Sequence, residues 1–402
     1  MLTTMYATPR GVTSDPMTVE LWNYSDLRPL SRIELADKIS VTWSMQGPDT
    51  AEIVVPYSEA TAPLMETNGR VLVVVQLNGR RHISTVTKAV LEPANKVDEA
   101  ANISVTTSGA YSLLQAEVIP PSPGKPLTQQ VERENFTMTA PVETVVKSIV
   151  HFGQNRVGHP LSLTPDLGRG PVVTVTGRMK YASELIEQAL SGTGYRLALD
   201  PWFYGDPQPN NLGSGDPCVT VDVVPYRENP GLVFSRKGHD LEDWKLTRTR
   251  ASRTQFIVGD SGQGTEQKFR FVMEEDVTHT PWSIREGYTS SQGDSKSEMI
   301  SEGKKALADN AESYQLEATL APSSVWEFGN DGKYPRQYDI GDWATIDLGE
   351  VGEVRQVITE VTAELTPAAF TVTPKVTTPD TYPSDIYSTV ASLAKRVDRL
   401  GG

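Results

Sequence analysis

The chain has 402 residues, of which 38% are hydrophobic and 22% are charged. This composition is that of a globular protein and excludes a disordered one, and the length predicts roughly two to four domains. The formal net charge of −14 argues against sequence-independent binding to nucleic acid, because neutralising phosphates requires surplus lysine and arginine.

Membrane, export and disulfide signals are weak in this sequence. The longest wholly apolar run, residues 71–75, is far shorter than a membrane span. Residues 1–10 lack the basic start and apolar core of a secretory signal, so we expect synthesis and assembly in a cytoplasm. The single cysteine, Cys218, excludes an internal disulfide and a thiolate metal cage.

Residues 1–119 are predicted to form a first β-barrel module. Most of its segments carry apolar residues on every second position, which is the period of a half-buried strand. Strands are predicted over residues 18–21, 39–45, 51–55, 71–77, 80–91 and 103–106. A short helical or turn segment follows at residues 111–114, and the proline-rich stretch 120–126 then ends the module.

Residues 120–230 change character and predict a small α+β domain. Thr139 as cap and Pro141 in the first turn open a helix with an apolar face, and His151 is expected to cap its end. That face consists of Val142, Val145, Val146, Ile149 and Val150. A second helix and three strands are predicted over residues 182–190, 172–176, 195–199 and 219–224.

Residues 231–376 are predicted to form a second β-barrel module with an excursion around residues 260–310. Its strand order at residues 343–376, including a glycine turn and a last strand from Phe370, matches that of residues 71–106. Such an internal repeat predicts two related modules. The expected fold is therefore mainly β, with two related β-barrels and an α+β insertion.

Residues 377–402 are predicted to be a proline-rich tether followed by a helix. Apolar residues recur there at heptad spacing, with polar residues between them. They are Ile386, Val390, Leu393, Val397 and Leu400. A heptad stripe is what two or three helices need to bury a shared seam, so we expect self-association as a coiled coil. The alternative is an amphipathic helix that packs on its own domain.

Two segments superficially suggest catalysis or metal binding. Gly259-Asp260-Ser261-Gly262 is similar to the segment around the nucleophile of chymotrypsin-like proteases, but none of the five histidines has the surroundings of that family's base. A glycine-rich hairpin turn explains the same letters. His239-Asp240-Leu241-Glu242-Asp243 offers one nitrogen ligand only, so a solvated loop is expected.

Two further acidic segments lead to the same conclusion. Glu274-Glu275-Asp276 does not supply a glycosidase pair, because adjacent carboxylates in a strand point to opposite faces. Asp206 and Asp216 lie in a glycine- and proline-rich loop without recognisable calcium spacing. We therefore predict no catalytic residue, no cofactor and no metal site.

Several short segments occur in an order that is typical of one family. They are Ile53-Val54-Val55-Pro56, residues 69–75, Asn78-Gly79, Tyr111-Ser112-Leu113-Leu114, Val233-Phe234-Ser235, Tyr338-Asp339-Ile340-Gly341-Asp342 and Phe370-Thr371-Val372-Thr373-Pro374. Through its whole length the chain thereby resembles the tail-hub proteins of long-tailed bacteriophages, also called tail-associated or minor tail proteins. These are similar to contractile baseplate hubs, and the version from phages of actinobacterial hosts looks closest.

The resemblance implies a structural homotrimer at the tail tip of the virion, not an enzyme. Two modules in each of three chains would make a pseudo-sixfold ring that adapts a sixfold tail tube to a threefold tip. The implied partners are the distal tail ring protein, the tape measure protein and tip or receptor-binding proteins. DNA would pass through the lumen during ejection, and the net charge motivates the hypothesis of an acidic lumen. The terminal stripe would gather three helices, although its residue types also suit a dimer.

The alternative is a carbohydrate-binding or cell-wall-hydrolysing tail-tip protein. Trp202, Phe203 and Tyr204 in the long loop would then form an exposed platform. Some family members carry a hydrolase or adhesin after the hub, whereas this sequence stops at Gly402, so we expect no enzymatic role. A sixfold distal tail ring protein with one barrel per chain is disfavoured by the internal repeat.

Overall fold

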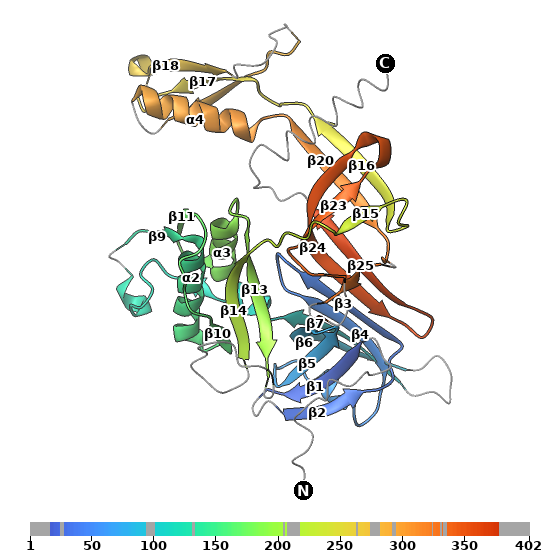
Figure 1. Ribbon diagram of the computed structural model, residues 1–402. Coiled ribbons are helices and arrows are strands. Elements are labelled where there is room, and N and C mark those ends of the chain that lie inside the picture. Colours follow the sequence, from blue (N-terminus) through green and yellow to red (C-terminus); the bar gives the residue numbers. More distant parts are fainter. Residues whose placement is uncertain are drawn as a thin grey trace. The chain divides into compact units, whose positions relative to one another are not determined.

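β-strands dominate the computed structural model of the chain (Figure 1). The structure describes residues 17–24, 28–93, 101–130, 133–203, 206, 218–262, 264–273, 282–291, 295–323, 325–329, 332 and 336–377. The chain divides into two units. The first contains Met1–Asp243 and Ala318–Pro383, and the second contains Trp244–Glu317.

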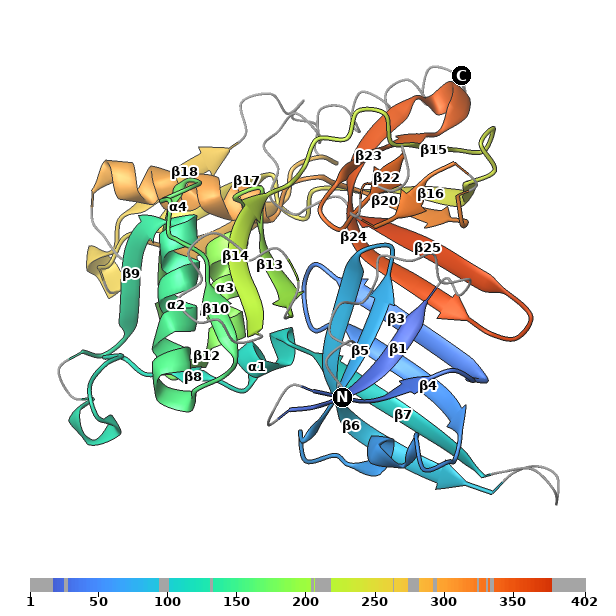
Figure 2. The same ribbon diagram turned by 60° about the horizontal axis from the view of Figure 1, so that its bottom comes forward.

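One eleven-stranded sheet forms the body of the first unit (Figures 1 and 2). Its strands are β1 (Thr18–Asn23), β2 (Arg28–Ile33), β3 (Lys38–Ser44), β4 (Thr50–Pro56), β5 (Val71–Leu77), β6 (Arg80–Glu92), β7 (Asn102–Gly109), β15 (Val233–Ser235), β23 (Trp343–Asp347), β24 (Glu353–Leu365) and β25 (Phe370–Thr377). The order is β15-β23-β24-β3-β4-β7-β6-β5-β1-β2, and β25 also pairs with β24. Only β15 and β23 are parallel, so the sheet is mixed.

The internal repeat expected from the sequence corresponds to two antiparallel three-stranded units, β5-β6-β7 and β23-β24-β25. Thr85 of β6 pairs with Leu72 of β5 and also with Ser108 of β7. Its counterpart Val357 of β24 pairs in the same way with β23 and β25. The two units therefore share one strand register.

Each of the two long central strands also carries a bulge at the same place. The register of β6 against β7 shifts between Val86 and Lys88. The register of β24 against β25 shifts between Ile358 and Glu360. A bulge bends its strand and increases the local twist, so the two units also bend at equivalent positions.

The expectation of two separate closed β-barrels is wrong for the residues that the structure describes. β24, from the later part of the chain, pairs with β3, which precedes β5-β6-β7. The pairing runs from Glu360 opposite Ser44 to Leu365 opposite Ile39. Both halves thus belong to one open sheet, whose path ends at β15 and at β2. Closure depends on pairing between strands that are far apart in sequence, and local periodicity does not encode it.

Helices and short sheets form the part of the first unit that lies between β7 and β15 in the sequence. The helices are α1 (Tyr111–Gln115), α2 (Val142–Val157) and α3 (Ala182–Leu190), and η2 (Leu127–Gln129) is a 3-10 turn. The strands are β8 (Val118–Ile119), β9 (Phe136–Pro141), β10 (Leu161–Leu163), β11 (Val172–Gly177), β12 (Lys180–Tyr181), β13 (Tyr195–Trp202) and β14 (Cys218–Pro225). β13, β14 and β10 form one sheet, with α2 and α3 side by side next to it (Figure 1).

The predicted apolar face of α2 is buried, but the ends of the helix differ from the prediction. All five predicted residues are 0% exposed and pack against α3. Thr139 does not cap the helix, because it lies in β9 and its hydroxyl is 2.8 Å from that of Thr174. The helix also runs past His151, whose ring lies 2.9 Å from the amide of Asn155, and ends at Gly158 with a φ of 78°.

The second unit contains a three-stranded sheet with a helix on one face. Its elements are β17 (Gln255–Gly259), β18 (Phe269–Met273), β19 (Glu286–Ser290), α4 (Lys296–Asp309) and the 3-10 turn η3 (Gly264–Glu266). A capping box between Ser295 and Glu298 starts the helix. Gly303 permits close packing, because a Cβ there would lie 2.6 Å from Val272 Cγ2.

The remaining elements are short pairs and turns. They are β16 (Leu241–Thr249) with β20 (Ser313–Leu320), β21 (Glu327–Phe328) with β22 (Gln337–Tyr338), and the 3-10 turns η1 (Ala62–Met65) and η4 (Gly349–Val351). The predicted coiled-coil residues Ile386, Val390, Leu393, Val397 and Leu400 lie outside the described residues. Across the described part of the chain, no helix has the length and apolar content needed to cross a membrane.

Candidate functional site

A polar junction connects three parts of the first unit. Arg80 follows the Asn78-Gly79 turn, and its guanidinium donates to Asp339 at 2.7 Å and to Asp200 at 2.6 Å. The side chains of Arg80 and Asp339 are only 12% and 11% exposed. One arginine therefore ties β6 to β13 and to the loop that precedes β23.

Backbone turns from the two halves of the sheet approach closely at this junction. The side-chain amide Nδ2 of Asn78 donates to the carbonyl of Phe328 at 3.0 Å. Gly329 has a φ of 139°, and a Cβ there would lie 2.4 Å from the Asn78 carbonyl oxygen. Gly341 has a φ of 84°, and a Cβ there would lie 2.4 Å from Arg196 Nε. Only glycine fits both positions without strain.

Asp342 is a buried acceptor in the loop that precedes β23. It is 1% exposed and accepts hydrogen bonds from Arg227 Nε at 2.6 Å, from Asn229 Nδ2 at 3.1 Å and from the Asp339 amide at 3.1 Å. Hydrogen bonds from a guanidinium to a carboxylate are stronger than those between neutral groups. These hydrogen bonds stabilise the loop that precedes β23.

The charges at the junction balance one another. Burial lowers the pKa of Arg80, but Asp339 and Asp200 outweigh that effect and raise its pKa above the ordinary value. Burial and the neighbouring Arg80 lower the pKa of Arg196. The two guanidiniums and Asp200 line a cavity of about 50 Å³. The ion pairs of the junction therefore stabilise the positions of its loops, which is a structural role.

The proposed aromatic platform of the long loop is wrong, because two of its three residues are buried. Trp202 and Phe203 are 8% and 7% exposed. The Phe203 ring lies 4.8 Å from that of Trp22 and 5.2 Å from the guanidinium of Arg81. Tyr204 lies outside the described residues.

Of the two acidic residues of that loop that were considered as calcium ligands, the structure describes only Asp206. Arg81 Nη2 donates to Asp206 at 2.9 Å, and a second bond makes the pair bidentate. Asp206 is therefore already occupied by a guanidinium and is a poor calcium ligand. Asp216 lies outside the described residues.

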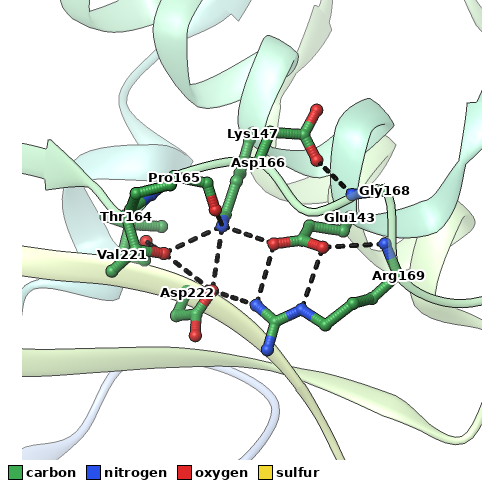
Figure 3. A network of polar contacts seen from close by, with 9 residues as sticks. All are labelled: Glu143, Lys147, Thr164, Pro165, Asp166, Gly168, Arg169, Val221 and Asp222. Atoms are coloured by element: carbon green, nitrogen blue, oxygen red, sulfur yellow. Dashed lines mark hydrogen bonds and ion pairs between the residues drawn. The ribbon is translucent and has the colours of Figure 1, made fainter. Parts of the chain in front are cut away.

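A second charged network lies within the α+β part (Figure 3). Glu143 of α2 is 0% exposed and accepts from Lys147 Nζ at 2.6 Å and from Arg169 Nε at 2.9 Å. Asp222 of β14 accepts from Arg169 at 2.5 Å, and Lys147 lies 2.9 Å from it. Thr164 also donates to Asp222 at 2.7 Å. The network joins α2, β14 and the segment after β10.

Glu117 is a buried acid that the sequence analysis did not identify. It is 0% exposed, and His159 Nε2 lies 3.4 Å from its Oε1. Burial raises the pKa of Glu117 to about 7 although Arg156 opposes the shift, and burial lowers the pKa of His159. Its immediate neighbours in sequence, Ala116 and Val118, give no signal of a buried acid.

The protease-like segment forms a turn between β17 and β18, as the sequence analysis favoured. Asp260 is 5% exposed and accepts hydrogen bonds from the amides of Gly262 at 3.1 Å and Lys268 at 3.0 Å. Such bonds, donated by nearby backbone amides to a carboxylate, stabilise the turn itself. This aspartate therefore has a structural role.

The segment around His239 also builds a turn. Asp240 is 3% exposed and accepts from the Ser235 amide at 2.7 Å and the Ser323 hydroxyl at 3.3 Å, while His239 has a φ of 61°. The expectation of a solvated loop is therefore wrong for Asp240, which is buried, and for residues 241–243, which begin β16. Among the described residues, no three metal-ligating side chains lie together. Residues 274–276, the third acidic segment, lie outside them.

Comparison with known proteins adds a family and a fold. The family model described as "Siphovirus ReqiPepy6 Gp37-like protein" matches residues 18–376. No curated protein sequence matches the chain.

Two solved structures are similar to the chain over nearly its whole length. The 43 kDa tail protein of prophage MuSo2 from Shewanella oneidensis has a TM-score of 0.52 and 12% identity, over 90% of this chain and 98% of that one. The tail protein from Neisseria meningitidis MC58 has a TM-score of 0.51 and 12% identity, over 92% of this chain and 100% of that one. The chain therefore shares the fold of these two proteins.

Proposed function

The chain belongs to the family of Siphovirus ReqiPepy6 Gp37-like proteins, and from that membership we propose that it is a structural hub at the tip of a phage tail. Three copies form a ring whose six similar sheet units adapt a sixfold tail tube to a threefold tip. The role is mechanical and requires no catalytic residue. The shared fold of two proteins described as tail proteins supports a place in the tail of the virion.

The observation that carries this proposal is the shared register of the two three-stranded units. The two units have the same strand order and a bulge at the same position of the central strand. In each, one residue of the central strand, Thr85 or Val357, pairs with both neighbouring strands. Units that are alike in backbone present similar surfaces to neighbours. Two such units per chain are what a trimer needs to match a sixfold partner.

The polar junction supports the same role. A hub transmits load between the tube above it and the tip below it, so its two halves must not slide. Arg80 joins the two halves through a charge-assisted bond to Asp339 in which both side chains are largely buried. The buried Asp342 stabilises the same loop through its bond to Arg227. The junction therefore holds the three-stranded unit β5-β6-β7 and the loop before β23 together within the first unit of the chain.

The mass of the purified assembly tests the proposal. We expect three times the chain mass of 44.0 kDa, by light scattering or native mass spectrometry. A stable monomer or a six-copy ring would refute the hub. In purified virions, antibodies against the chain are expected to label the tail end.

The net charge of −14 supports a bore that DNA passes without adhering. We expect the assembly not to retain duplex DNA at physiological salt. Retention that weakens steeply with added salt would instead show a basic bore. The proposed neighbours are the distal tail ring protein, the tape measure protein and tip or receptor-binding proteins.

The terminal helix and the host remain separate proposals. Ile386, Val390, Leu393, Val397 and Leu400 are proposed to gather three helices at the tip as a coiled coil. Removing residues 384–402 is then expected to weaken the trimer. We also propose an actinobacterial host, on the resemblance in sequence described above.

Carbohydrate binding is a second candidate, supported by a different surface from the one expected. In the second unit, Ile257 pairs with Phe271 on one side and Tyr288 on the other, and both aromatic residues are exposed, at 49% and 58%. Trp282 is 89% exposed. Glycan-array binding that disappears in the Tyr288→Ala variant would favour this candidate, and absence of binding by the wild type would remove it.

A further inference from the structure

One edge of β6 lacks a partner strand over part of its length. Thr85 pairs with β5 and β7 at once, so these strands lie on opposite edges of β6. β7 pairs as far as Glu92, whereas β5 stops at Thr85. Among the described strands, none pairs with the β5 edge from Lys88 to Glu92. We name these residues, 88–92, the vacant edge.

The equivalent edge of β24 is filled. Val357 pairs with β23 and β25, which places those two strands on opposite edges of β24. Residues 360–365 pair with β25 and also with β3. β3 therefore lies on the β23 edge and covers it beyond the point where β23 stops.

The shared bulge aligns the two edges residue by residue. Lys88 and Glu360 are each the first paired residue after the bulge. Three positions later come Leu91 and Ala363, which are therefore counterparts. Ala363 is 0% exposed in the strand covered by β3, whereas Leu91 is 48% exposed.

An uncovered strand edge with an exposed apolar side chain is a template for pairing with another strand. Natural proteins block such edges when they are not used, for example with proline or an inward-pointing charge. The sequence of the vacant edge, Lys88-Ala89-Val90-Leu91-Glu92, contains no proline. Its two charged residues are confined to its ends, and the central three residues are apolar. It is suited to accept a strand.

We infer that the vacant edge is covered by β16 of a second copy of this chain, an inference that rests on the proposed ring. β3 precedes the first three-stranded unit in the chain and pairs with β4. β16 precedes the other three-stranded unit, β23-β24-β25, in the same way and pairs with β20. Within a chain β3 covers β24, and between chains β16 covers β6. Three chains then close a ring through six similar strand contacts.

Substitution at the vacant edge tests this inference. Leu91→Lys places a charge on the face of the sheet, directly beside the side chains of the neighbouring strand, and is expected to raise the dissociation constant of the trimer by at least about tenfold. Leu30→Lys is the matched control, because Leu30 is 47% exposed on β2 at the far end of the sheet. Circular dichroism of both variants should equal that of the wild type.

Three outcomes separate this inference from the proposed hub. A wild type that is not a trimer refutes the hub and the inference together. A trimeric wild type whose Leu91→Lys variant stays equally trimeric, or whose Leu30→Lys variant dissociates as strongly, refutes the inference alone. Dissociation of the Leu91→Lys variant only supports it.

Crosslinking identifies the occupant. A photoreactive amino acid at position 91, in trimers mixed from isotopically light and heavy chains, is expected to attach to a peptide that contains β16 of the other copy. Attachment to any other segment, or only within one chain, overturns the assignment. Amides of residues 88–92 are also expected to exchange more slowly in the trimer than in diluted monomer.

Discussion

Replacing Glu143 by glutamine removes one negative charge from a buried network and keeps the shape of the side chain. The carboxylate accepts from Lys147 Nζ at 2.6 Å, Arg169 Nε at 2.9 Å and the Arg169 amide at 2.8 Å. In the variant, two cations remain close together with Asp222 as their nearest acidic partner. We expect a marked loss of stability in α2.

The pKa of Glu143 sets the size of that loss. Burial raises it, but hydrogen bonds from Arg169 and Lys147 outweigh burial and lower the pKa from 4.5 to about 2. This difference corresponds to roughly 3 kcal/mol of stability. Because the folded pKa is the lower one, the stabilisation is fully present above about pH 4.5 and is lost as the pH falls toward 2.

Hydrogen exchange of α2 amides measures the free energy of opening directly. At pH 7 we expect Glu143→Gln to lower it by roughly 3 kcal/mol, and by about half as much at pH 3. Glu184→Gln is the matched control, since Glu184 also pairs with a lysine four residues away but is 44% exposed. Its effect should stay below about 0.5 kcal/mol. A loss under about 1 kcal/mol for Glu143→Gln, or one independent of pH, would refute the reasoning.

Three other substitutions test the junction and the buried acid. Arg80→Ala leaves Asp339 without its main partner and is expected to lower the free energy of unfolding in urea by about 3 to 5 kcal/mol; a loss below about 1 would contradict a rigid junction. Gly329→Ala should lower the melting temperature more than Gly349→Ala, because both glycines have positive φ (139° and 73°) but only at Gly329 does a Cβ meet backbone, at 2.4 Å. Equal shifts would count against the close approach. Glu117→Gln is expected to stabilise the chain at pH 8 by up to roughly 3 kcal/mol and to have little effect near pH 4, because its folded pKa of about 7 lies above the ordinary 4.5 and its ionised form therefore destabilises the fold as the pH rises. Identical urea midpoints for wild type and variant at pH 8 would show that the carboxylate is not desolvated.

Periodicity predicted the strands that have one buried face. β3 alternates as expected, with Ile39, Val41 and Trp43 all buried. β2 was not predicted, because it pairs with a single neighbour at the end of the sheet and most of its side chains are exposed, Leu30 among them. A strand that buries little apolar surface leaves little pattern in the sequence.

Composition was misleading where a long-range partner decides burial. The glycine- and proline-rich segment after β13 was expected to expose its aromatic residues, but Phe203 is covered by Trp22 and Arg81. The junction of Arg80 with Asp339 joins residues 259 positions apart, so no local window contains both. The repeat itself was visible in sequence because its order and spacing are local, whereas the pairing of β24 with β3 was not.

That pairing also affects how the chain is made. The hydroxyls of Thr42 and Thr362 lie 3.0 Å apart although 320 residues separate them. At ribosomal speeds of about 5 to 20 residues per second, the outer side of β3 waits roughly 16 to 64 s for its partner to be synthesised. During that time neighbouring nascent chains on one messenger RNA expose the same unpaired edge of β3, which can pair with another strand and cause aggregation. We therefore expect the soluble yield to depend on chaperones that cover β3 until translation is complete.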